Sequence, residues 1–187
     1  MRKFILINEL EVLRRIVKKL EYAGIPYMIT GSVAANFYTT PRMTRDIDIV
    51  IEVVENDVDM LFSLFSKDFY IDKDSVRNAI CEKKMFNIIH NEGIVKVDFI
   101  VKKDIEYRKI EFGRKQCIDF EGLRINITSP EDLVLSKLFW ARESISEIQI
   151  RDVKNILRTV PNLDIDYLEK WVKELKLERV YKEVKDE

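Results

Sequence analysis

The feature that most restricts the fold is the order of secondary-structure signals along the chain. Segments rich in β-branched residues, with alternating apolar and polar positions, all precede residue 128. Beyond it only helical spacing remains, starting at Ser129-Pro130, where a capping serine precedes a proline in the first helical position. This order predicts an α+β chain: a mixed twisted sheet flanked by helices over residues 1–127, and a helical tail packed on it over residues 128–187.

The individual elements follow from periodicity and turn residues. Asn91-Glu92-Gly93 and Glu121-Gly122 are typical of hairpin turns, because Asn and Gly accept the backbone angles that such turns need. We expect strands at 27–30, 46–53, 84–90 and 94–101 and a hairpin over 114–127, and helices at 8–23, 33–38, 56–65, 75–82, 130–143, 147–159 and 165–184.

The composition indicates in which cellular compartment the protein is expected, but it does not indicate a function. The chain has 32 basic and 33 acidic residues, so its charge requires neither a nucleic acid nor a membrane as partner. It lacks an apolar run of the roughly 20 residues that span a bilayer. Cys81 and Cys117 form no C-x-x-C pattern, and we expect reduced thiols in a cytoplasmic protein. The single histidine, His90, is expected at a hairpin end in a structural role.

Asp46 and Asp48 are the first residues that suggest chemistry. Residues two apart on a strand point to the same face, so both carboxylates leave one side of the predicted strand 46–53. Two adjacent negative charges repel unless a cation lies between them, one is protonated or water screens them. The chain has three other D-x-D pairs, which we expect to be helix caps or turn residues: Asp57/Asp59, Asp72/Asp74 and Asp164/Asp166.

Candidate nucleotide-binding residues precede Asp46 and Asp48 in the sequence. Gly31 lies at a strand-to-helix turn, where the absence of a side chain allows the backbone to approach a ligand closely. Ser32 either caps the following helix or donates its hydroxyl to a phosphate. Arg42, Thr44 and Arg45 complete the candidate nucleotide-binding set, although each arginine, taken alone, is more typical of a solvated side chain.

A third carboxylate, Asp98, alternates with apolar residues on the predicted strand 94–101. An acid in so apolar a strand requires compensation, because an unpaired buried charge is costly. Either it forms an ion pair with a nearby Lys or Arg, or strand 94–101 lies beside strand 46–53 and Asp98 joins Asp46 and Asp48. Three carboxylates would suit Mg²⁺ or Mn²⁺, which prefer oxygen ligands.

Lys137 and Asp152 each lie within the apolar stripe of a predicted helix. Two opposite charges on apolar faces of successive helices should pair, because an unpaired buried charge costs roughly 3–5 kcal/mol. The pair could hold the helical tail together. Alternatively, Lys137 could reach a triphosphate while Asp152 orients it or the acceptor.

The spacing of these residues resembles the polymerase-β-like nucleotidyltransferase superfamily. Gly31-Ser32, then Arg42-x-Thr44-x-Asp46-Ile47-Asp48, then Asp98 carry the resemblance, which extends over about residues 8–157. It is greatest to the small prokaryotic branch that includes the AbiEii-type toxin nucleotidyltransferases.

The resemblance implies roles for these residues. The three aspartates would bind metal, the Gly-Ser pair would hold the triphosphate, and Lys137 and Arg151-Asp152 match a lysine and an Arg-Asp of toxin-type relatives. We therefore expect a metal-dependent enzyme that moves a nucleoside monophosphate from a nucleoside triphosphate (NTP) to an RNA, protein or small-molecule acceptor. The alternative is a non-catalytic nucleotide-binding or regulatory module, with a possible partner in a toxin–antitoxin pair.

Overall fold

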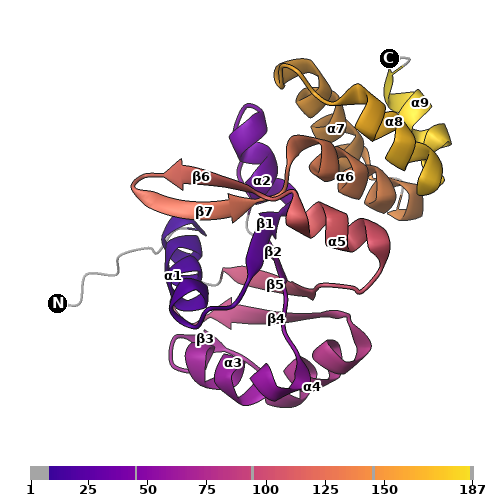
Figure 1. The fold of residues 1–187 in the computed structure, drawn as a ribbon. Coiled ribbons are helices and arrows are strands. Elements are labelled where there is room, and N and C mark those ends of the chain that lie inside the picture. The colour runs from indigo at the N-terminus through magenta and orange to yellow at the C-terminus, as the bar shows by residue number, and fades with distance from the viewer. Residues whose placement is uncertain (1–8, 45, 94, 145, 186–187) are drawn as a thin grey trace. The chain divides into compact units, whose positions relative to one another are not determined.

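The computed structural model describes residues 9–44, 46–93, 95–144 and 146–185. The chain divides into two compact units (Figure 1). The first, which we call the sheet unit, comprises Met1–Val33 and Met43–Ile127, and the second, the helical unit, comprises Ala34–Arg42 and Thr128–Glu187. Helix α2 (Gly31–Tyr38) begins in the sheet unit and ends in the helical unit.

The described strands form one seven-stranded sheet of order β3-β4-β5-β2-β1-β7-β6. The pairs β2/β5 and β1/β7 are parallel, and the remaining neighbours are antiparallel. Such a mixed sheet with flanking helices confirms the predicted α+β class. The strands are β1 (Tyr27–Thr30), β2 (Asp46–Ile51), β3 (Phe69–Tyr70), β4 (Met85–His90), β5 (Lys96–Val101), β6 (Gln116–Phe120) and β7 (Leu123–Ile127).

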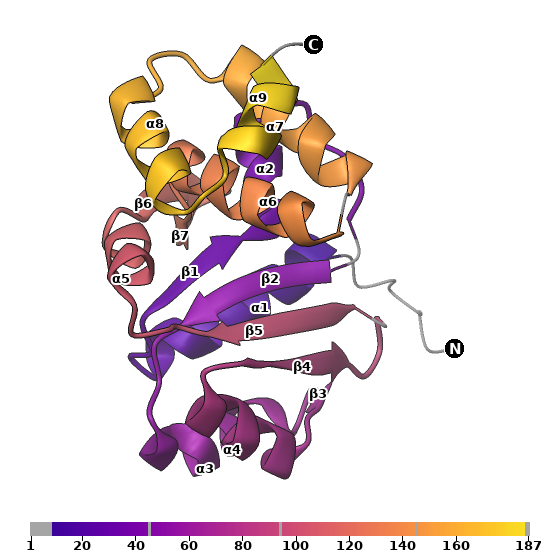
Figure 2. The same ribbon diagram turned by 90° about the vertical axis from the view of Figure 1, so that its right-hand side faces the viewer.

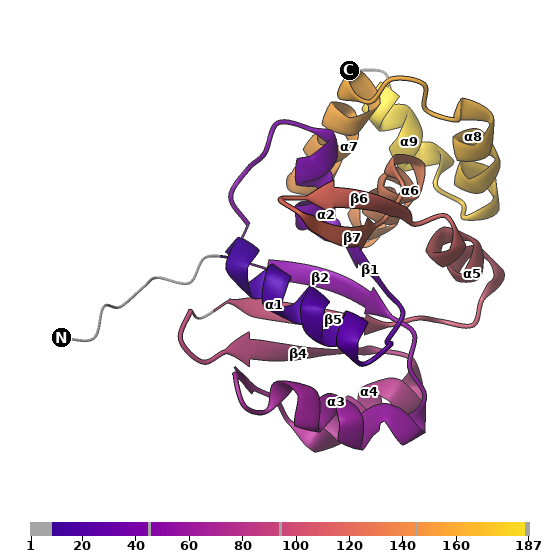
Figure 3. The ribbon, with the colours of Figure 1, turned by 60° about the vertical axis from the view of Figure 1, so that its left-hand side comes forward.

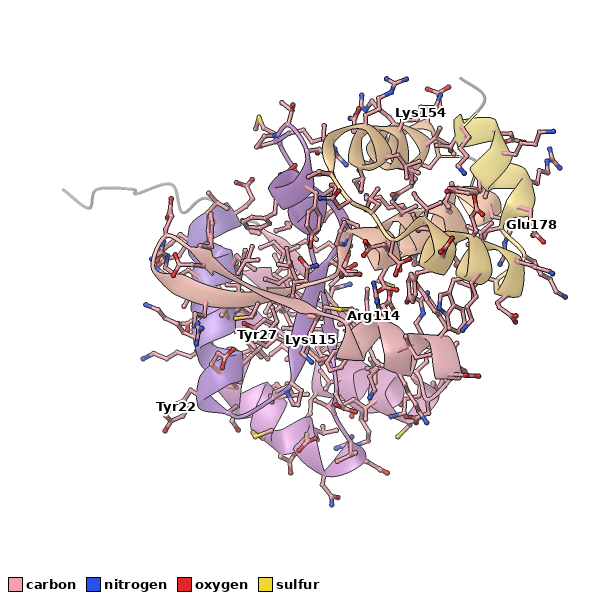
Figure 4. The ribbon with its side chains drawn as sticks, turned by 45° about the horizontal axis from the view of Figure 1, so that its top comes forward. Tyr22, Tyr27, Arg114, Lys115, Lys154 and Glu178 are labelled. Atoms are coloured by element: carbon pink, nitrogen blue, oxygen red, sulfur yellow. The ribbon has the colours of Figure 1, made fainter. Side chains whose placement is uncertain are left out.

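One face of the sheet is covered by helices of its own unit. Helix α1 (Glu9–Tyr22) lies across β2 and β5 in Figure 3, and in Figure 2 the same strands stand in front of it. The buried stripe of α1 recurs at three- and four-residue spacing, as predicted: Val12, Leu13, Ile16, Val17 and Leu20. Tyr22, at the end of α1, points outward, whereas Tyr27 on β1 is 1% exposed (Figure 4).

The aromatic part of this core involves α3 (Val58–Phe65), which follows a short 3₁₀ helix, η1 (Glu55–Asp57). The Phe65 ring contacts that of Phe99 on β5 at 5.3 Å and that of Phe69 on β3 at 5.7 Å between centroids. Helix α4 (Lys73–Glu82) begins at Asp72, whose carboxylate accepts a hydrogen bond from the Ser75 N–H at 2.7 Å. Asp72 is therefore a helix cap, as the sequence predicted.

Two elements of the sheet unit were not predicted from the sequence. Strand β3 has only two residues, too few to show alternation. Helix α5 (Glu106–Gly113) has Ile105 at its N-cap and no side-chain capping bond, so the usual polar start signal is missing. The predicted hairpin over 114–127 is confirmed, and Glu121 and Gly122 both have positive φ angles at its turn.

The helical unit contains α6 (Pro130–Ser144), α7 (Glu147–Thr159), α8 (Ile165–Glu174) and α9 (Glu178–Lys185). The prediction of one helix over 165–184 is wrong, because the chain breaks at Lys176, where φ is +56°. The Leu177 N–H donates to the Val172 carbonyl at 2.8 Å and closes α8. In a continuous helix the apolar stripe would change sides between Leu175 and Leu177, so the sequence did carry a sign of the break.

The start of α6 is a buried polar network. The Asp132 N–H donates to Ser129 Oγ at 3.2 Å, while the Ser129 hydroxyl donates to the Asp132 carboxylate at 2.6 Å. The Tyr167 hydroxyl of α8 donates to the other Asp132 oxygen at 2.6 Å. The predicted helix start is confirmed, and Asp132, which is fully buried, also ties α8 to α6. No helix among the described residues has the length and apolar character needed to cross a membrane.

His90 stabilises the turn after β4. Its imidazole is 2% exposed, and Nδ1 accepts hydrogen bonds from the N–H groups of Glu92 and Gly93 at 3.3 and 3.2 Å. The Phe69 ring packs edge-on against it at 5.0 Å. Burial, followed by the charge of Arg15, lowers the pKa of His90 below its usual 6.5, so the neutral form is favoured in the folded chain.

Unfolding should therefore become easier in mild acid. The unfolded chain binds a proton at His90 near pH 6.5 and the folded chain only at lower pH, so the free energy of unfolding should fall as the pH drops below about 6.5. Urea titrations between pH 5 and 7.5 would measure this. His90→Asn keeps a turn acceptor but does not titrate, and its stability should be nearly flat in that window. An unchanged slope in this variant would contradict the assignment.

Candidate active site

The second face of the sheet carries polar residues in adjacent positions on four strands. The register pairs Thr30 on β1 with Asp48 on β2, Asp48 with Asp98 on β5, and Asp98 with Asn87 on β4. Paired residues of neighbouring strands point to the same face, so these four side chains form a row across the sheet. The prediction that strand 94–101 lies beside strand 46–53 is confirmed.

Two residues earlier in the same register, Asp46 pairs with Lys96. Asp46, Asp48, Lys96 and Asp98 thus form a two-by-two set on one face, which we call the carboxylate block. The intervening residues point to the helix-covered face, where Ile47 and Val97 are fully buried. Asp46 is exposed and Asp98 is 7% exposed, so the block extends from solvent into the interior.

Gly31 lies directly against Asp48. Its φ is +65°, a value that favours glycine, and a Cβ atom placed on it would lie 2.0 Å from Asp48 Oδ2. The sequence predicted a close approach of the backbone at Gly31 to a ligand, and the structure shows such an approach to the Asp48 carboxylate. Because Gly31 is also the first residue of α2, the start of that helix and the carboxylate block are adjacent.

Lys96 is the member of the block that the sequence analysis missed. Its Nζ lies 2.7 Å from Asp98 Oδ2, so the ion-pair alternative for Asp98 is observed. The hydrogen bond to Asp98 is the main factor that raises the pKa of Lys96, and the charges of Asp98, Asp46 and Asp48 add to it. The available signal was the position of Lys96 two residues before Asp98, on the same face of the strand.

The other candidate residues of the sheet unit differ in their contacts and burial. Thr44 donates its hydroxyl to the backbone carbonyl of Asp46 at 3.2 Å, which fixes the chain just before β2. Ser32 is half-buried in the first turn of α2. Arg45 lies outside the described residues. Among the described residues, no three His, Cys, Asp or Glu side chains already gather closely enough to enclose a metal ion.

A second charged group lies within the helical unit. Lys137 Nζ on α6 is 2.8 Å from Asp152 Oδ2 on α7, which confirms the predicted pairing. Gln149 Oε1 accepts a further hydrogen bond from Lys137 at 3.0 Å. Arg42, assigned from the sequence to a nucleotide or to solvent, binds the same carboxylate through Nη2 at 3.0 Å and Nε at 3.3 Å.

Asp152 is therefore a buried carboxylate held by two cations. Burial alone would raise its pKa, but the hydrogen bonds and charges of Arg42 and Lys137 outweigh burial and leave the pKa below its usual value. The side chains of Lys137 and Asp152 are 3% and 5% exposed, whereas that of Arg42 is 30% exposed. Water can thus reach Arg42 but hardly Lys137, and loss of Asp152 would affect Lys137 most.

Comparison with known proteins identifies the family. Residues 9–185 match the family described as "Nucleotidyl transferase of unknown function (DUF2204)". This chain belongs to that nucleotidyltransferase family. The match covers both units of the chain, and the fold is the polymerase-β-like one. A comparison with curated proteins finds no match.

Several solved structures share the fold of this nucleotidyltransferase. ANT(2")-Ia in complex with adenylyl-2"-tobramycin has 13% identity and a TM-score of 0.60, over 90% of this chain and 98% of that one. The lincosamide antibiotic adenylyltransferase LnuA, lincomycin-bound, has 14% identity and a TM-score of 0.56, over 82% and 99%. An antigenic nucleotidyltransferase-like protein from Paracoccidioides brasiliensis has 20% identity and a TM-score of 0.51, over 82% and 76%. At these identities the similarity shows the fold alone.

The contact between Gly31 and Asp48 predicts an unequal effect of two glycine substitutions. Gly24 and Gly31 both have φ of +65°, but only Gly31 has an atom within 4 Å of the added Cβ position. Gly24→Ala should cost about 1 kcal/mol of stability from backbone strain. Gly31→Ala should cost a further 1–3 kcal/mol, roughly, because Asp48 must move. Urea unfolding of both variants measures the difference, and equal losses would contradict the close approach.

The helical-unit group predicts a coupled response. Asp152→Leu should cost about 3–5 kcal/mol of stability, because Lys137 is left buried without its carboxylate. Lys137→Met should cost less, since Arg42 still pairs with Asp152. The double variant should recover most of the Asp152→Leu loss in thermal and urea unfolding. Strictly additive losses would show that the two residues do not interact.

Proposed function

We propose that this nucleotidyltransferase transfers a nucleoside monophosphate from an NTP to an acceptor hydroxyl in a reaction that depends on Mg²⁺ or Mn²⁺. The acceptor oxygen forms a bond to the α-phosphorus, the bond from that phosphorus to the bridging oxygen breaks, and pyrophosphate leaves with the electron pair. The observation that carries the proposal is the register that sets Asp48 beside Asp98 and Gly31 against Asp48.

The residues of the carboxylate block fit a divalent metal ion. Asp46, Asp48 and Asp98 offer only oxygen donors, from adjacent strands and one sheet face, which is the chemistry that Mg²⁺ prefers. When bound, the metal would neutralise phosphate charge and lower the pKa of the attacking hydroxyl. Asp98 would in addition accept the proton of the acceptor hydroxyl. Its place beside Asp48, on the same face of the sheet, favours that role.

Other residues would position the nucleotide. The backbone of Gly31 has room to approach the β- and γ-phosphates, and Ser32 in the first turn of α2 can donate its hydroxyl to them. Thr44 and Arg45 precede β2 and remain candidates for the same contacts. Within the helical unit, Asp152 orients both Lys137 and Arg42. A contact of Lys137 with the nucleotide, and a role of Asp152 in orienting Lys137 or the acceptor, stay predictions.

The acceptor class and biological setting belong to the proposal as well. Two proteins of the same fold are named for or bound to antibiotic substrates or products, which makes a small-molecule hydroxyl one acceptor to test. RNA and protein hydroxyls are the other two. Membership of the AbiEii-type branch and a toxin–antitoxin partner stay predictions, as does a cytoplasmic location. Incubation with each α-labelled NTP and pools of transfer RNA, protein and small molecules would reveal the acceptor by the position of the label.

Metal should control nucleotide binding if the proposal is correct. Three carboxylates on one face repel a triphosphate unless a divalent cation intervenes, so calorimetry with the four NTPs should show binding with Mg²⁺ and at least tenfold weaker binding with EDTA, roughly. Asp48→Asn should abolish pyrophosphate release without lowering the melting temperature. Equal NTP affinity in EDTA would contradict the proposal.

A matched control comes from another D-x-D pair. Asp74 lies in the first turn of α4, where it pairs with Arg77 at 2.8 Å. Asp74→Asn removes the same charge from the same sequence pattern but outside the carboxylate block, and it should leave NTP binding and turnover unchanged. If Asp48→Asn unfolds the protein while Asp74→Asn does not, Asp48 has a structural role instead.

A further inference from the structure

Lys96 gives the carboxylate block a cation of its own. On β5 it lies two residues before Asp98, and in the register it is the direct partner of Asp46 on β2. Its ammonium is 2.7 Å from Asp98 Oδ2. The block therefore holds three acidic groups and one basic group on a single sheet face, and the basic group touches the least exposed of the acids.

The Lys96 ammonium also lies close in the register to the other two acids of the block, Asp46 and Asp48. Asp46 is its direct register partner on β2, and Asp48 is the register partner of Asp98 on the same sheet face. The positive charge of Lys96 in turn stabilises the block, because it reduces the mutual repulsion of carboxylates that the register places side by side. In contrast to Asp98, whose side chain is 10% exposed, the Lys96 side chain is 43% exposed. A flexible stem at a half-open position lets the ammonium leave without disturbing the strand.

We propose that Lys96 is a tethered cation that holds the carboxylate block together and competes with the divalent metal ion for Asp98. This inference rests on the proposed function, since it assigns the metal to Asp46, Asp48 and Asp98. The ammonium and a divalent ion cannot both approach Asp98 Oδ2 closely, because their like charges repel at such short range. Metal binding is then an exchange in which Lys96 moves toward solvent, and Lys96 sets the affinity of the block for the metal.

The exchange predicts opposite effects of one substitution on two measurements. Lys96→Met removes the competing cation, so the block should bind Mn²⁺ about tenfold or more tightly. In the presence of EDTA the same variant should melt at a lower temperature, because three carboxylates lose their internal counter-ion. Added Mn²⁺ should then raise its melting temperature by more than it raises that of the wild type.

The experiment is a titration of the full-length protein with Mn²⁺, without nucleotide, followed by the loss of the free-ion signal in electron paramagnetic resonance. Lys96→Gln serves as a second neutral variant that keeps a hydrogen-bond donor for Asp98 in case Lys96→Met folds poorly. Lys96→Arg keeps the positive charge and should resemble the wild type. Lys103→Met removes an exposed lysine two residues after β5 and should change neither Mn²⁺ affinity nor melting temperature.

The outcomes separate this inference from the proposed function. Tighter Mn²⁺ binding by both neutral variants, abolished by adding Asp48→Asn, supports the exchange. Wild-type Mn²⁺ binding that requires Asp48 but is equal or weaker in the neutral Lys96 variants overturns the inference and leaves the proposed function standing. Absence of Mn²⁺ binding in the wild type and in both neutral variants overturns both.

Discussion

The parallel pairing of β2 with β5 is the constraint on which the candidate site depends. It sets Asp48 directly beside Asp98, an arrangement of like charges that destabilises a sheet when nothing compensates it. The same register brings the ammonium of Lys96 beside Asp46 and onto Asp98. The apolar residues of both strands face the opposite side, so a one-residue slip would bury the acids and expose the core. The hydrophobic pattern thereby holds the acids together.

Gly31 links the sheet to the helix that follows β1. Because the Asp48 carboxylate occupies the space where a Cβ would lie, only glycine fits this turn. The carboxylate block and the start of α2 are consequently placed by the same short contact. In the helical unit, Asp152 performs a comparable function, because its carboxylate accepts hydrogen bonds from both Lys137 and Arg42. Each unit thus contains one charged group that its own packing fixes.

Features that depend on periodicity could be predicted from the sequence. Contacts between residues that are distant in the chain could not. The alternation in residues 46–53 and 94–101 was sufficient to predict two neighbouring strands with their acids on one face. The pairing of Lys137 with Asp152 followed from two helical stripes. The contact of Arg42 with Asp152 could not be predicted in this way. The two residues are 110 positions apart, and Arg42 does not belong to a segment with a periodic apolar pattern.

Several elements were not predicted from the sequence, each for a different physical reason. Strand β3 is too short to alternate, and α5 lacks a polar N-cap. The break between α8 and α9 coincides with a change of side of the apolar stripe between Leu175 and Leu177, which the prediction of one helix overlooked. Lys96 was visible in the sequence, but its ion pair with Asp98 is known only from the observed 2.7 Å contact. The roles of the site residues in catalysis stay predictions.

The most direct test of the central claim is an anomalous difference map from crystals grown with Mn²⁺ and a non-hydrolysable NTP analogue. The account predicts an Mn²⁺ peak about 2 Å from carboxylate oxygens of Asp48 and Asp98, with Asp46 in the same cluster and the analogue's phosphates on the metal. Lys96 Nζ should have moved away from Asp98. A map with Mn²⁺ bound elsewhere, or with the Lys96–Asp98 ion pair intact and the nucleotide remote from the carboxylate block, would contradict it.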